Sequence, residues 1–248
     1  MRRRGFGSAL LLNDLRSWSH HRLAWGCLGI AAAVLVLHVS GSTGPSLFRE
    51  GLGGPAVVRL GGQLRMGAGW TWLLTGVLFA VSTTVLFEPL SPWIQLTLVR
   101  GVTPQAWVAA RLGALAVGAS VYLATLLATM AVVMLVGHPG PLISVETGWD
   151  VGLWTLGLVA LGWFAMALVL VTNTAWPALV SPLILLGVAR FGGNAAPYTP
   201  FAQWIIGLHG LPGTLTVAVG AAYVLLWTLL SGAVAVRWAA RALPSHHD

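Results

Sequence analysis

The sequence predicts an all-α polytopic membrane protein with six transmembrane helices, and three observations support that fold class. Of its 248 residues, 57% are hydrophobic and only 8% are charged, whereas a soluble domain carries roughly 25% charged residues. Long apolar runs alternate with polar, turn-rich loops. Many of the 13 tryptophans lie near the ends of those runs, where they would anchor helices at a membrane surface.

Residues 1–22 precede the first apolar run and are expected to form an amphipathic helix at the cytoplasmic membrane face. Leu11, Leu15 and Trp18 recur at helical spacing, whereas Asp14 and other polar residues are assigned to different faces. The alternative is a basic leader without fixed structure that only sets membrane orientation.

A transmembrane domain is expected over residues 23–241, followed by a polar cytoplasmic tail at 242–248. The fifth apolar run is the shortest, and Pro177 and Pro182 interrupt it, so a complete span, a broken span and a re-entrant segment all remain open. Residues 191–213 are too polar and turn-rich to cross a membrane. The six predicted spans are about residues 23–40, 68–87, 107–136, 151–172, 176–189 and 214–236.

The arginines predict the orientation of these spans. The chain contains no lysine, and its arginines lie near the ends of apolar runs, which fits membrane orientation better than nucleic-acid binding. Placing both termini in the cytoplasm puts nine arginines inside and four outside. The outer four are Arg49, Arg59, Arg65 and Arg190, and the inner nine are Arg2, Arg3, Arg4, Arg16, Arg22, Arg100, Arg111, Arg237 and Arg241.

The sequence lacks the motifs of most catalytic sites. A phosphate-binding loop of the Walker type needs a lysine, and no catalytic pair of carboxylates falls within a predicted span. His38, His138 and His209 match no metal-ligand spacing. We therefore expect no catalytic residue, no metal and no cofactor on this chain, and no nucleic-acid partner.

Residues 87–111 form a hinge between the second and third predicted spans. It contains two prolines near its start, a half-apolar middle, and turn residues at Gly101 and Pro104. Such a segment favours a short helix at the cytoplasmic membrane face, through which another protein would move this one.

Polar and small residues in the spans allow two interpretations each. Thr83, Tyr122, Thr125 and Thr129 either line a polar substrate pathway or satisfy neighbouring backbone groups. Two ridges of small residues on the third span either pack helices within the chain or form a subunit interface. The ridges consist of Ala110, Ala114 and Gly118, and of Ala116, Ser120, Ala124 and Ala128.

Together these features resemble the ABC-2 type permease family of bacterial ABC transporters. The hinge sequence LVRGVTPQAWVAARLGAL is similar to that family's recurring turn, in which a basic residue, a short turn and an aromatic residue precede a basic residue opening the third span. The segment PYTPFAQWIIGLHGLPG resembles the family's outer segment between spans five and six. The likeness covers nearly the whole chain, although the loop at 41–67 is longer than is usual and would contact either lipid headgroups or cargo.

The resemblance implies a permease subunit in the bacterial inner or plasma membrane that is not itself an enzyme. It would pair with a second permease subunit, contact membrane lipids, and be driven by separate ABC ATPase subunits that bind ATP and Mg²⁺. Residues 92–105 would be the coupling helix in an ATPase groove, with 1–22 alongside and 191–213 capping the outer side. The residues assigned to coupling are Glu88, Trp93, Gln95, Arg100, Thr103, Trp107 and Arg111.

The expected function is export of a hydrophobic or amphipathic substrate such as a lipid, peptide or antibiotic. We further expect Glu88 and Arg111 to form a partly buried ion pair at the base of the hinge. The alternative function is a membrane scaffold or sensor that binds a cytoplasmic partner without moving cargo.

Overall fold

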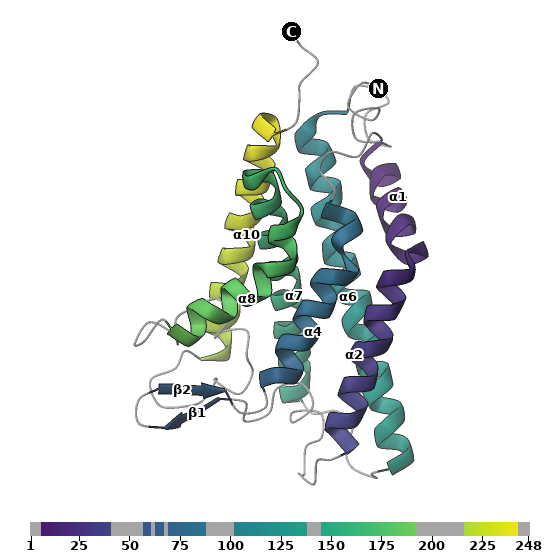
Figure 1. Cartoon of the computed structure of the whole chain (residues 1–248), viewed down its shortest axis with the longest axis vertical. Helices are drawn as coiled ribbons and strands as arrows, with labels where there is room; N and C mark the ends of the chain where they lie inside the picture. Colours follow the sequence, from purple (N-terminus) through teal and green to yellow (C-terminus); the bar gives the residue numbers. More distant parts are fainter. Residues whose placement is uncertain are drawn as a thin grey trace.

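The computed structural model describes residues 6–40, 57–60, 63–66, 69–87, 102–137, 145–191 and 216–242. Within these ranges the chain is a bundle of α-helices with one short β-hairpin at one end (Figure 1). The elements are α1 (Phe6–His20), α2 (Arg22–Ser40), β1 (Val57–Leu60), β2 (Gln63–Met66), α4 (Gly69–Ser82), the 3-10 helix η1 (Thr84–Phe87), α6 (Pro104–Gly137), α7 (Val145–Thr172), α8 (Trp176–Phe191) and α10 (Val217–Ala242).

From α2 onward, successive helices run in alternating directions along the long axis of the bundle (Figure 1). α6 and α7 pack against each other at its centre, α10 packs mainly on α7, and α2 packs on α4 and α6. The first turn of α1 and the last turn of α10 lie at the same end, and the antiparallel pair β1–β2 lies at the other (Figure 1).

Among the described residues, three helices are long and apolar enough to cross a membrane: Pro104–Val133, Val151–Thr172 and Val217–Arg241. They correspond to the third, fourth and sixth predicted spans. α1 and α2 would make a fourth if counted as one span, but they meet at a bend of 63°. The helical fold class is therefore confirmed, and the three candidate spans are compatible with a membrane protein. The number of six spans stays a prediction.

The other predicted spans coincide with shorter or broken helices. α4 has 14 residues and α8 has 16, and both lie alongside the longer helices (Figure 1). The hairpin β1–β2 was not predicted and falls within the 41–67 loop. The expected outer segment at 191–213, apart from Phe191, and the tail at 242–248, apart from Ala242, lie outside the described residues.

Three consecutive hydroxyls explain why α4 ends early. Ser82 donates a hydrogen bond to the Phe79 carbonyl at 2.7 Å, Thr83 donates to the Phe79 and Ala80 carbonyls, and Thr84 donates to the Val81 carbonyl at 2.7 Å. Side chains that bond carbonyls of the preceding turn compete with the helical backbone pattern. The chain accordingly turns at Thr83 and continues as the 3-10 helix η1.

The connection from α7 to α8 uses a left-handed residue. Asn173 has a φ of 54° directly after the last residue of α7, and asparagine tolerates this conformation at a helix C-terminus better than most residues do. α8 then begins at Trp176 and contains Pro182, so the fifth predicted span is a helix with an internal proline.

A glycine sets the close approach of α7 and α10. A methyl group on Gly232 of α10 would lie 2.5 Å from Cε3 and 2.6 Å from Cζ3 of Trp163. The indole cannot easily retreat, because its Nε1 donates a hydrogen bond to the Leu112 carbonyl of α6 at 3.0 Å. Gly232 and Trp163 therefore hold α7, α10 and α6 in one arrangement.

We expect Gly232→Ala to lower the thermal unfolding temperature of the purified protein, since overpacking of a fitted contact costs about 1–3 kcal/mol. Gly152→Ala is the matched control, because a methyl group there meets no atom within 4 Å and alanine favours helix by up to about 1 kcal/mol. Equal unfolding temperatures of the two variants would show that α7 and α10 do not depend on close packing between Gly232 and Trp163.

Candidate functional site at the junction of α1, η1 and α6

α1 packs along the first half of α6, over one of the two small-residue ridges. A methyl group on Gly113 would lie 3.4 Å from Leu11, and one on Gly118 would lie 4.0 Å from the ring of Trp18. Ala114 between them is fully buried. The ridge Ala110–Ala114–Gly118 thus packs helices within the chain. On the second ridge, Ser120, Ala124 and Ala128 are exposed.

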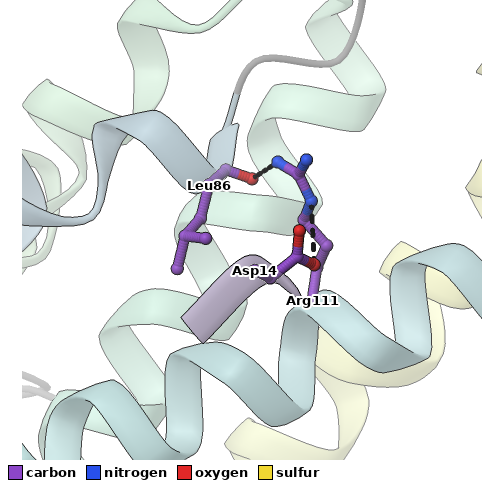
Figure 2. A network of polar contacts seen from close by, with 3 residues as sticks. All are labelled: Asp14, Leu86 and Arg111. Carbon is purple, nitrogen blue, oxygen red and sulfur yellow. Dashed lines mark hydrogen bonds and ion pairs between the residues drawn. The ribbon is translucent and has the colours of Figure 1, made fainter. Parts of the chain in front are cut away.

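Arg111 joins three elements at this junction (Figure 2). Its Nε lies 3.3 Å from Oδ2 of Asp14 on α1, and its Nη1 donates a hydrogen bond to the Leu86 carbonyl of η1. Both charged side chains are only 11% exposed. One guanidinium therefore joins α1, the end of η1 and α6. These three elements are far apart in the sequence, so helical periodicity alone does not predict the contact.

The surroundings of this ion pair are apolar. The Arg111 guanidinium carbon lies 4.5 Å from the centre of the Trp107 ring, a cation–π distance. Trp18, Leu86 and Val108 are buried in the same cluster. Few waters can screen the charges here, so their attraction is strong, but either charge alone would be poorly solvated.

Burial raises the pKa of the Asp14 carboxyl, and the attraction of the Arg111 guanidinium opposes that shift. The location of Asp14 corrects the sequence analysis, which assigned it to a face away from Leu11, Leu15 and Trp18. Position 14 lies between 11 and 18 on the packed side of α1, and Asp14 is buried there because Arg111 supplies its counter-ion.

The predicted coupling residues fall into two groups. Glu88, Trp93, Gln95 and Arg100 lie outside the described residues, so the expected Glu88–Arg111 pair stays a prediction. Thr103 is exposed and caps α6: its carbonyl accepts from Trp107 N at 3.0 Å and its Oγ1 accepts from Ala106 N at 3.2 Å. Trp107 is 3% exposed, so its side chain supports the junction from inside instead of presenting a surface to a partner.

The predicted pathway residues all bond backbone carbonyls. Thr83 donates to Phe79 and Ala80, and the fully buried Tyr122 donates across to the Thr75 carbonyl of α4 at 3.1 Å. On α6, Thr125 donates to Val121 at 3.0 Å and Thr129 donates to Thr125 at 2.9 Å. These hydroxyls therefore satisfy neighbouring backbone groups, and their role in a substrate pathway stays a prediction.

In the part of the chain that the structure describes, no group of three His, Cys, Asp or Glu side chains gathers as a metal site would require. Comparison with models of known protein families gives no match, and no curated protein is significantly similar to the chain. The functional assignment therefore depends on the fold and on the α1–η1–α6 junction.

We expect Asp14→Asn and Arg111→Gln each to lower the free energy of unfolding by roughly 2–5 kcal/mol, because each leaves a buried charge without its partner. The double variant Asp14→Asn/Arg111→Gln should lose less than the sum of the two, with a coupling of about 1–3 kcal/mol. Thermal or denaturant unfolding in detergent gives the free energy of unfolding of the wild type, the two single variants and the double variant. Arg237→Gln, at an exposed position of α10, is the control, and strictly additive losses would contradict the ion pair.

Proposed function

We propose that the chain is the permease subunit of an ABC transporter of the ABC-2 type in a bacterial cell membrane. It spans the membrane six times, with both termini in the cytoplasm. Separate ATPase subunits bind ATP and Mg²⁺ and dock on residues 92–105, and a second permease subunit completes the transporter. The cargo is hydrophobic or amphipathic and is exported.

The observation that carries this proposal is the junction built on Arg111. In the sequence, the proposed coupling segment lies between η1, which ends at Phe87, and α6, which begins at Pro104. Arg111 of α6 contacts Leu86 of η1 and Asp14 of α1. Movement of the segment that links η1 to α6 would be passed to α1 through the Arg111 guanidinium. Such an arrangement suits a device that passes motion from a cytoplasmic partner to a helical bundle.

The distribution of arginines along the bundle supports the orientation. Arg16 belongs to α1, and Arg237 and Arg241 lie near the end of α10. The first turn of α1 and the last turn of α10 lie at the same end of the bundle (Figure 1). Strands β1 and β2, which carry Arg59 and Arg65, lie at the opposite end (Figure 1). The end with more arginines is assigned to the cytoplasm.

The mechanism then follows from the stiffness of α6. This helix has 34 residues and runs nearly the full length of the bundle (Figure 1). Arg111 fixes the N-terminal part of α6 to α1 and η1. The middle of α6 is fixed to α4 by the Tyr122–Thr75 hydrogen bond and by the edge-on contact between Tyr122 and Phe79. Closure of the ATPases would therefore tilt α1, α4 and α6 together and change the pathway between subunits.

We test the proposal by purifying the tagged chain from native membranes in mild detergent and measuring vanadate-sensitive ATP hydrolysis and subunit stoichiometry. We expect a stoichiometric ATPase, and we expect Arg100→Ala or Gln95→Ala to reduce both its retention and its hydrolysis at least several-fold. Arg190→Ala, near the end of α8 at the hairpin side of the bundle, is the control and should behave as wild type.

A folded oligomer without any nucleotide-hydrolysing partner would refute the permease assignment and favour the scaffold or sensor. An ATPase that is retained equally by wild type, Arg100→Ala and Gln95→Ala would refute the assignment of residues 92–105 as the coupling contact. Trp107→Ala is unsuited to this test because Trp107 is buried against Arg111, and its loss would disturb folding.

A further inference from the structure

A groove opens on the surface where α1 bends into α2. The two helices meet at 63° near His21, and the wedge between them faces α6. The resulting cavity measures about 500 Å³, within the range of about 300–1,000 Å³ that small-molecule sites occupy. Its walls include Leu15, Trp18, Trp25, Leu28, Val117 and Val121.

Hydrogen bonds to backbone carbonyls cross the bend and give it a defined geometry. His21 N donates to the Trp18 carbonyl at 3.1 Å, and Ala24 N donates to the His21 carbonyl at 3.0 Å. The indole Nε1 of Trp25 donates to the Ser19 carbonyl at 2.7 Å. Trp25 thereby bonds a carbonyl at the end of α1 while its ring forms a wall of the groove.

The groove combines an apolar interior with one cation. Arg16 lines it, and within the described ranges its guanidinium has no acidic partner. Ser19 also lines the groove, and its hydroxyl donates a hydrogen bond to the Arg16 carbonyl at 3.0 Å. The walls thus offer little to the polar backbone of a peptide, but they suit a hydrocarbon chain with an anionic group beside Arg16.

The exposed side chains of the walls favour an apolar occupant. Leu12 is 65% exposed and Trp25 is 60% exposed, and Val117 and Val121 on α6 are exposed as well. At a membrane face, burial of these side chains against an acyl chain is favourable, and a guanidinium binds phosphate through paired, charge-assisted hydrogen bonds. Basic pockets between helices at the cytoplasmic face bind anionic headgroups in this way.

We infer that this groove, between the α1–α2 bend and α6, binds one anionic phospholipid of the leaflet at the α1 end, with an acyl chain against Trp25, Val117 and Val121 and its phosphate on Arg16. The site requires that the bundle lie in a membrane but does not require an ATPase partner. Its test is therefore independent of the test of the proposed function.

The first experiment measures binding of phosphatidylglycerol to the delipidated protein by native mass spectrometry, with phosphatidylcholine as the zwitterionic comparison. Wild type should retain one phosphatidylglycerol preferentially. Arg16→Gln should weaken that binding about tenfold, because it removes the charged bond to phosphate, and Val121→Trp should weaken the binding of both lipids by filling the groove.

The matched controls are Arg237→Gln and Val132→Trp, which change an exposed cation on α10 and an exposed valine on α6 outside the groove. Both should bind phosphatidylglycerol as wild type does. Equal binding by Arg16→Gln and Arg237→Gln, or by Val121→Trp and Val132→Trp, would overturn the inference.

A second experiment uses the wild-type chain and therefore does not depend on the folding of any variant. Phosphatidylglycerol with a photoreactive acyl chain is added in nanodiscs, and cross-linked peptides are identified by mass spectrometry. We expect cross-links to concentrate in residues 12–28 and 117–121. Cross-links distributed evenly over the exposed faces of α6 and α10 would overturn the inference.

Discussion

The arrangement of the end of the bundle where α1, η1 and α6 meet depends on one buried charge. Arg111 enters an apolar cluster of Trp18, Leu86 and Trp107, where an isolated guanidinium would be strongly unfavourable. Its polar partners include the Asp14 carboxylate of α1 and the Leu86 carbonyl of η1, and these offset the cost of its burial. Each of these acceptors belongs to a different element, so the Arg111 guanidinium joins α6 to both α1 and η1.

The same requirement for satisfied polar groups explains much of the rest of the bundle. In an apolar environment each hydroxyl and each freed carbonyl needs a partner within the chain. The hydroxyls of Ser82, Thr83 and Thr84 donate hydrogen bonds to carbonyls of the preceding turn and thereby end α4. Tyr122 and Trp163 instead reach neighbouring helices, at the Thr75 and Leu112 carbonyls. Local bonds therefore set where helices stop, and bonds between helices set how they pack.

The sequence predicted the long helices well and the polar contacts poorly. Apolar runs of sufficient length identified α6, α7 and α10 because the hydrophobic signal is continuous over each. The end of α4 was harder to predict, since it depends on the hydroxyls that interrupt that helix from within. α8 begins at Trp176, as predicted, and continues through Pro182 to Phe191. The hairpin β1–β2 lies in a glycine-rich loop whose composition gave no strand signal.

The candidate site shows why the partners of a buried ion pair are hard to predict from sequence. Arg111 was recognised as an anchor from its position at the start of a span. Its partner was sought at Glu88, the nearest carboxylate along the hinge, whereas the described partner Asp14 lies 97 positions away (111 − 14) on α1. The helical spacing of Asp14 from Leu11 and Trp18 was visible, but a lone carboxylate on that side indicates burial only if its counter-ion is known.

The most direct test of this account measures whether the Asp14–Arg111 pair holds α1 on α6. Spin labels at Ser17 on α1 and Val132 on α6, both exposed, would be introduced in a Cys27→Ser background and their separation measured by pulsed electron resonance. We predict a single narrow distance distribution for the otherwise wild-type chain and a broad one after Arg111→Gln. An unchanged narrow distribution would show that apolar contacts alone hold α1, and would contradict the role assigned to the ion pair.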